Sequence, residues 1–216
     1  MQYKELRRDL LHVVLKLYKG DLIQMQSGNV SVRASETHIV ITPGGIPYDT
    51  MTTEDMVILN LDGSVAGGNH NPSSETPMHM AIYRSMPKVS AVVHSHSPYA
   101  MAFATVGRSI PVICTEGLAV GGPIPVAAYA CPGTEAQGKV AVQAMKGPPP
   151  VAGTLLKNHG ALTTGKSLAR AYTTACSIEM AARIYFLALQ IGVPDILTEE
   201  QLHEIEHVYA LKRYSP

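Results

Sequence analysis

An apolar run that ends in two histidines one residue apart is the feature that most constrains how this chain folds. The run covers residues 89–97, and His94 and His96 stand near its end. Residues two apart in a β-strand point to the same face of a sheet, so both imidazoles can reach one metal ion. We therefore predict a buried strand over 89–97 that holds a metal site rigidly. On spacing alone, two ordinary strand histidines remain the alternative interpretation.

A third histidine extends this prediction. His159 follows two leucines and precedes Gly160, which lets the backbone come close, and we predict a short buried strand over 154–160. Three histidines bind a zinc-type ion and leave one coordination position open for water or substrate. A structural zinc site usually adds a fourth protein ligand, so the pattern favours a catalytic site.

A Ser-Ser-Glu step at 73–75 predicts an anion pocket. We expect Ser73 or Ser74 to cap a helix that runs to about Met86, because serine accepts hydrogen bonds from the first helical N–H groups. A helix amino terminus with adjacent hydroxyls favours phosphate. Glycines at 28 and 44–45 provide further backbone amides that can surround an anion. Simple helix capping is the alternative for Ser74 and Glu75.

Composition excludes several functional classes. The 216 residues carry 17 basic and 17 acidic side chains, interspersed, which predicts no nucleic-acid partner. No run reaches the roughly 18 apolar residues that a membrane-spanning helix needs, and the charged, amphipathic stretch at 1–20 is unlike a signal peptide. The odd, widely spaced cysteines, Cys114, Cys131 and Cys176, indicate reduced thiols in a cytoplasmic protein.

The length fits one domain over 1–216. Further elements are expected as strands at 29–34 and 37–42, a hairpin at 56–68, and helices at 134–145, 167–191 and from 198 onward. Strands and helices without regular alternation predict a layered α/β sandwich around a mainly antiparallel sheet.

Five motifs resemble those of the class II aldolase/adducin family in order and spacing. They are Gly28-Asn29-Val30-Ser31, ITPGGIPY at 41–48, SSETPMH at 73–79, VVHSHS at 92–97 and LLKNHGAL at 155–162. The chain is most similar to the L-fuculose-phosphate aldolase branch of that family. The resemblance implies a three-layer αβα sandwich and a homotetramer with active sites at subunit interfaces.

The resemblance also implies the site residues. Zn²⁺, with Mn²⁺ or Co²⁺ as alternatives, would be held by His94, His96 and His159. Phosphate would be held by Gly28, Asn29, Gly44, Gly45, Ser73 and Ser74. Glu75 would be the acid/base carboxylate, and Tyr209 matches a catalytic tyrosine near the family's carboxyl terminus. A buried helix aromatic is the alternative for Tyr209.

The implied reaction is reversible cleavage of a ketose 1-phosphate to glycerone phosphate and an aldehyde through a metal-stabilised enediolate. The substrate resembles fuculose 1-phosphate or a 5-deoxy- or methylthio-pentulose 1-phosphate. Two positions depart from the branch. Thr115 stands where it carries a tyrosine that protonates the departing oxygen, and a threonine hydroxyl is a far poorer acid. Either Glu116 or a zinc-adjacent water substitutes for the tyrosine, or the second substrate and even the reaction differ. Gly44 stands where the branch carries threonine.

Other activities of the same fold remain open. They are a 3-oxo-tetronate 4-phosphate decarboxylase, a pentulose-phosphate 4-epimerase and a methylthioribulose-phosphate dehydratase. Glu75 counts against the epimerase, because the epimerases of this family have Ser-Ser-Asp where this chain has Ser-Ser-Glu at 73–75. A non-enzymatic binding module like the adducin head would need an incomplete metal set.

Two other histidine patterns are not predicted to bind metal. Residues 203–207 match HExxH, the helix motif of zinc proteases, with His203 and His207 on one helix face. The segment is strongly charged, which favours a solvated helix face and makes a zinc protease a remote alternative. His79 is expected to pack its helix and not to bind metal.

Overall fold

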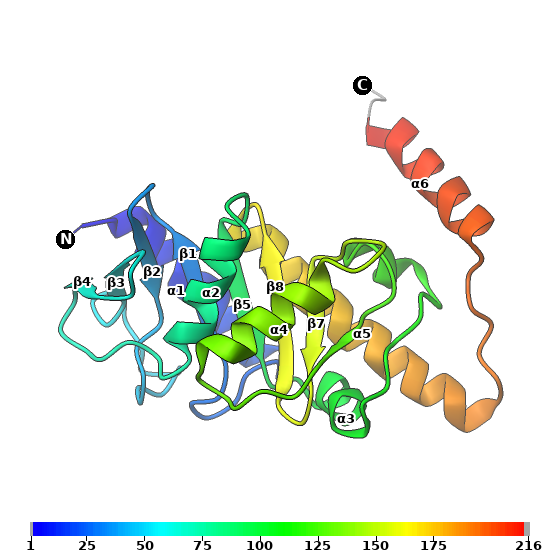
Figure 1. Cartoon of the computed structure of the whole chain (residues 1–216), viewed down its shortest axis with the longest axis horizontal. Helices are drawn as coiled ribbons and strands as arrows, with labels where there is room; N and C mark the ends of the chain where they lie inside the picture. The colour runs from blue at the N-terminus through cyan, green and yellow to red at the C-terminus, as the bar shows by residue number, and fades with distance from the viewer. Residues whose placement is uncertain (1, 214–216) are drawn as a thin grey trace.

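The computed structural model describes residues 2–213, and one eight-stranded sheet forms its centre (Figure 1). The strands are β1 (Asn29–Arg33), β2 (His38–Ile41), β3 (Val57–Asn60), β4 (Val65–Gly67), β5 (Ala91–Ser95), β6 (Val126–Ala127), β7 (Gly153–Leu156) and β8 (Gly160–Gly165). They lie in the order β4-β3-β2-β1-β5-β8-β7-β6, and only β6 and β7 pair in parallel. The predicted mainly antiparallel sheet is confirmed.

Helices cover both faces of this sheet. They are α1 (Lys4–Lys19), α2 (Thr76–Ser85), α3 (Pro98–Val106), α4 (Glu135–Met145), α5 (Leu168–Ile191) and α6 (Glu199–Arg213), with a 3₁₀ turn, η1 (Thr115–Ala119). Alternate residues of β5 serve opposite cores: Val92 packs with α2 and α4, while Ala91 and Val93 pack with α1 and the start of α5. The chain is therefore an αβα sandwich, as expected (Figure 1).

The segment predicted as one strand over 154–160 is a tight hairpin instead. β7 ends at Leu156, Asn158 adopts a positive φ of 59°, and β8 begins at Gly160. Asparagine tolerates this left-handed conformation, and a strand cannot continue through it. His159 consequently lies in a turn, and the prediction of a strand histidine is wrong. His96 likewise lies one residue beyond the end of β5.

Two further elements differ from the sequence-based expectation. α3 was not predicted, although Pro98 in its first turn and Gly107 with a φ of 68° at its end are ordinary helix boundary signals. We predicted that Ser73 or Ser74 caps α2, but the N-cap residue is Glu75. The Ser73 hydroxyl instead accepts from the Glu75 backbone N–H at 3.3 Å.

The last helix stands apart from the sheet. α6 follows an extended connection after Gly192 and lies away from the layers (Figure 1). A backbone hydrogen bond from Leu197 N–H to Val112 O, 3.0 Å long, ties that connection to the body. Within residues 2–213, no helix combines the length and apolar character that crossing a membrane requires.

Candidate metal centre

Three imidazole rings meet at the end of β5. The ring centroids of His94, His96 and His159 lie 4.8, 4.8 and 4.9 Å from one another, which makes a nearly equilateral triangle. The antiparallel pairing of β5 with β8 places Ser95 opposite Ala161, so the hairpin turn before β8 carries His159 to the other two. The three predicted ligands therefore converge.

The tautomer of His94 suits metal binding. Its Nδ1 lies 2.9 Å from the Ala161 carbonyl oxygen, which can only accept, so Nδ1 carries the proton. Nε2 then faces the centre of the triangle, 2.9 Å from Nε2 of His96. A backbone carbonyl that orients a histidine in this way is typical of metal sites.

Burial keeps His96 in the neutral form that binds metals. Burial lowers the pKa of His96 to about 4, and the neighbouring imidazoles act in the same direction. Its backbone N–H donates to the Leu22 carbonyl at 3.0 Å, which holds the residue beyond the strand end. The donor set therefore fits a divalent cation such as zinc.

The Glu75 carboxylate lies beside the triangle of imidazoles and contacts two of them. Its Oε2 is 3.0 Å from His94 Nε2, and its Oε1 is 2.8 Å from His159 Nε2. Burial by itself raises the pKa of Glu75, but His94, His159 and a hydrogen bond from Asn29 outweigh it and hold that pKa well below its usual range. The carboxylate is thus ionised, and it can act as a fourth ligand or accept a proton.

These four side chains are the one group of three or more metal-ligand residues in the described part of the chain. Their ligand atoms lie within 4.8 Å of one another. The HExxH segment offers no comparable group, because His203 and His207 lie exposed on α6. This placement supports the solvated-face interpretation.

A cavity of about 500 Å³ opens in front of the imidazoles. Its lining includes every residue predicted to hold phosphate, namely Gly28, Asn29, Gly44, Gly45, Ser73 and Ser74. Glu75, His96 and His159 line it as well, while fully buried His94 lies behind them. The structure therefore brings together segments that lie far apart in the sequence.

Gly28 shows why one of these positions demands glycine. Its φ is +86°, and a Cβ there would lie 2.5 Å from Ile23 Cγ2 and 2.9 Å from the His94 carbonyl oxygen. The Tyr48 hydroxyl donates to the Gly28 carbonyl at 2.6 Å and secures the turn. This loop is thus pressed directly against the strand that carries the metal ligands.

Two residues implied by the resemblance lie outside this cavity. Tyr209 is on α6, with 44% of its surface exposed, and is not among the lining residues. Exposed Thr115 begins η1 and is not among them either. The alternative of a buried helix aromatic is wrong for Tyr209. A role at a neighbouring subunit's site stays a prediction for it.

The sequence reasoning missed other lining residues. They are Gln26, Ser27, Pro43, Pro132 and Gly133. Residues 26 and 27 adjoin the motif at 28–31, and Pro43 lies within the motif at 41–48, so proximity in sequence was an available signal. Gly133 was not foreseeable, since only the tertiary fold brings it so close that a Cβ would lie 3.1 Å from the Ser74 carbonyl oxygen.

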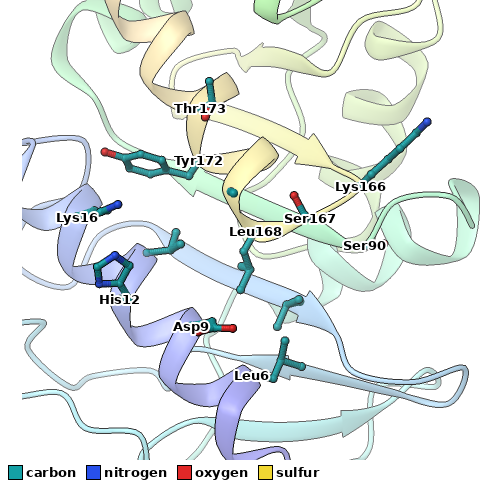
Figure 2. Close-up of a pocket in the computed structure, with 13 residues that line it drawn as sticks. Leu6, Asp9, His12, Lys16, Ser90, Lys166, Ser167, Leu168, Tyr172 and Thr173 are labelled. Atoms are coloured by element: carbon teal, nitrogen blue, oxygen red, sulfur yellow. The ribbon is translucent and has the colours of Figure 1, made fainter. Parts of the chain in front are cut away.

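A second cavity, of about 680 Å³, lies between α1 and the start of α5 (Figure 2). Asp9, His12 and Lys16 line it from α1, and Lys166 and Ser167 from the segment that opens α5. It shares no lining residue with the cavity at the imidazoles, and its charges have both signs. None of the predicted site residues lines it.

Comparison with known proteins agrees with these features. The family model described as "Class II Aldolase and Adducin N-terminal domain" matches residues 8–186. A 5-deoxy-D-ribulose 1-phosphate aldolase of Bacillus thuringiensis serovar kurstaki is 35% identical, covering 92% of this chain and 92% of its own. The L-fuculose phosphate aldolase of Escherichia coli K12 is also 35% identical, covering 94% and 93%.

A solved L-fuculose 1-phosphate aldolase superposes with a TM-score of 0.90 at 30% identity, covering 97% of this chain and 98% of its own. An L-ribulose-5-phosphate 4-epimerase of Salmonella paratyphi B is 32% identical, covering 88% and 87%. The similar proteins therefore include both aldolases and an epimerase.

Proposed function

Because this chain belongs to the class II aldolase and adducin family, we propose that it cleaves a ketose 1-phosphate reversibly to glycerone phosphate and an aldehyde. The observation that carries this proposal is the convergence of three imidazoles and the Glu75 carboxylate beside the cavity lined by the predicted phosphate residues. The proposed substrate resembles fuculose 1-phosphate or a 5-deoxy- or methylthio-pentulose 1-phosphate. A small, apolar aldehyde end suits a chain with threonine at 115.

We propose that His94, His96 and His159 hold one Zn²⁺ per subunit, with Mn²⁺ or Co²⁺ as alternatives. The lowered pKa of His96 and the carbonyl that orients His94 support this assignment. When bound, the cation supplies Lewis acidity, which stabilises negative charge on substrate oxygens as the carbon–carbon bond breaks.

The remaining roles follow from position around the cavity. The phosphate-binding set is the six residues named above, and anchoring the phosphate fixes which substrate carbon faces Glu75. The Glu75 carboxylate takes and returns a proton at carbon 3 of the glycerone phosphate portion. Its imidazole and Asn29 contacts hold its two oxygens in fixed directions.

The assembly is also part of the proposal. We place Tyr209 at the active site of a neighbouring subunit in a homotetramer, in line with the exposure of α6 outside the sandwich. A single domain over 1–216 agrees with relatives that cover more than nine-tenths of the chain. The three free cysteines agree with a cytoplasmic location.

A pentulose-phosphate 4-epimerase is the second candidate, and the Salmonella relative favours it. A phosphotetronate decarboxylase and a methylthioribulose-phosphate dehydratase would use the same site residues. The aldolase is preferred because the Bacillus and Escherichia coli K12 relatives, each 35% identical to this chain, are named aldolases, whereas the epimerase is 32% identical.

Product formation tests the reaction. Zinc-loaded protein is incubated with glycerone phosphate and a panel of small aldehydes, and the sugar phosphates are identified by mass spectrometry. We expect a ketose 1-phosphate with at least one apolar aldehyde. No product with any aldehyde would overturn the aldolase and favour the decarboxylase or dehydratase.

Variants test the individual residues. Glu75→Ala should keep zinc but lose exchange of the carbon 3 protons of glycerone phosphate with solvent, and full exchange would refute its role. His159→Ala should lose bound zinc. His203→Ala is the matched control, because His203 lies on α6 outside the metal-ligand group and its loss should leave the zinc content unchanged.

A further inference from the structure

A chain of buried hydrogen bonds leads from Glu75 into the interface between α2 and β1. Asn29 Nδ2 lies 2.7 Å from Glu75 Oε2, and Asn29 Oδ1 lies 2.6 Å from His79 Nε2. Ser31 Oγ lies 2.6 Å from His79 Nδ1 and 2.9 Å from the Tyr83 hydroxyl. Asn29, Ser31, His79 and Tyr83 are each at most 3% exposed.

The spacing of these residues explains why they meet. Asn29 and Ser31 are two apart on β1, so their side chains point to the same face of the sheet. Glu75, His79 and Tyr83 are successively four apart at the start of and along α2, so they share one helix face. The strand and the helix thus present two matching polar rows inside an otherwise apolar layer.

The direction of every bond in this chain is determined. An amide nitrogen only donates and an amide oxygen only accepts, so Asn29 Nδ2 donates to Glu75 Oε2 while Asn29 Oδ1 accepts from His79. Nε2 of His79 must therefore carry a proton. A neutral imidazole has one N–H, so Nδ1 accepts from the Ser31 hydroxyl, and Tyr83 then donates to Ser31.

Burial agrees with this assignment. It lowers the pKa of His79 to about 3, so the imidazole is neutral at physiological pH. It also raises the pKa of Tyr83, so the phenol keeps the proton that it donates to Ser31.

We propose that His79 is a positioning residue that, through Asn29, holds the Glu75 carboxylate in its orientation toward His94 and His159. The inference rests on the acid/base role proposed for Glu75. A flipped Asn29 amide would turn its oxygen toward the carboxylate, and two acceptors would repel each other. The His79 N–H prevents this flip, while Ser31 and Tyr83 hold His79 in the required tautomer.

Two amide substitutions separate the two ends of the imidazole. In His79→Gln, the side-chain nitrogen takes about the place of Nε2 and still donates to Asn29. In His79→Asn, the shorter side chain places its oxygen near Nδ1, which keeps the Ser31 bond and leaves Asn29 without its donor. The two variants therefore differ in which neighbour of His79 they satisfy, and each retains one of its two hydrogen bonds.

Steady-state kinetics on the zinc-loaded variants measures the consequence. Loss of a supporting partner in a metal site typically costs about 10–100-fold in activity, and we expect this fall in kcat for His79→Asn with KM and zinc content unchanged. His79→Gln should rescue most of kcat. Equal kcat in the two variants, whether high or low, would overturn the proposal, since a merely structural histidine would not distinguish them.

A second measurement needs no catalytic activity and no variant. Long-range ¹H–¹⁵N correlation spectra of the wild-type protein should show His79 as the neutral Nε2–H tautomer from about pH 5 to pH 9. An Nδ1–H tautomer or a charged ring would overturn the inference. A protein with the expected tautomer that makes no sugar phosphate would instead refute the proposed function, so the two failures are distinguishable.

Discussion

Replacing Gly160 by alanine should damage the metal centre through contact alone. Gly160 begins β8 beside β5, and a Cβ there would lie 2.4 Å from the Ser95 carbonyl oxygen and 3.1 Å from His94 Cε1. Ordinary contacts of a Cβ begin at 3.4 Å, so the two strands must separate by about 1 Å. Gly160 is not among the glycines with positive φ, so alanine meets no additional backbone strain.

The expected magnitude follows from two opposing effects. Overpacking a well-packed site costs about 1–3 kcal/mol, whereas alanine restricts the unfolded chain and returns about 0.4–1 kcal/mol. We therefore expect Gly160→Ala to lower the free energy of unfolding by about 1–2 kcal/mol. A shift of about 1 Å also exceeds the roughly 0.5 Å tolerance of a metal site, so zinc affinity should fall by about tenfold or more.

Urea unfolding of the metal-free protein and zinc competition with a chromogenic chelator measure the two effects. Gly192→Ala is the matched control, because its φ of 178° is extended and a Cβ there would meet nothing within 4 Å. The control should show no loss of stability and only the gain of about 0.4–1 kcal/mol from the restricted unfolded chain. Wild-type stability and wild-type zinc affinity in Gly160→Ala would refute the packing argument.

Two further substitutions test contacts outside the centre. The Glu179 carboxylate accepts the backbone N–H groups of Tyr99 and Ala100 at 3.0 and 2.9 Å and so caps α3; Glu179→Ala should lower the unfolding free energy by about 1–2 kcal/mol in urea titrations, and an unchanged midpoint would contradict this. Burial raises the pKa of Asp55, but hydrogen bonds from Thr52 and the nearby His70 imidazole outweigh it and lower that pKa overall. Its contribution to stability is therefore full above the unfolded pKa of about 4 and is lost as the pH falls through the lower folded value. The stability difference between wild type and Asp55→Asn should thus shrink in acid, and a constant difference down to pH 2 would count against it.

Local sequence patterns were sufficient for much of the fold. The apolar run around Val92 and Val93 predicted β5, and the amphipathic pattern over residues 1–20 is that of a helix and corresponds to α1. The same-face rule for residues two apart predicted that His94 and His96 meet, and their Nε2 atoms lie 2.9 Å apart. These features depend only on the periodicity of a strand or a helix, which a sequence displays directly.

The partners of those histidines were decided by the tertiary structure. His159 reaches the centre because β8 pairs with β5 in one particular register, and a slip of one residue would turn its neighbours to the opposite face. His79 was expected on sequence grounds to be a simple packing residue, yet the approach of α2 to β1 brings it 2.6 Å from Asn29. The sequence alone determined which side chains are capable of the chemistry. Strand pairing and helix packing decided which of them meet, because contacts between distant segments depend on how the whole chain packs.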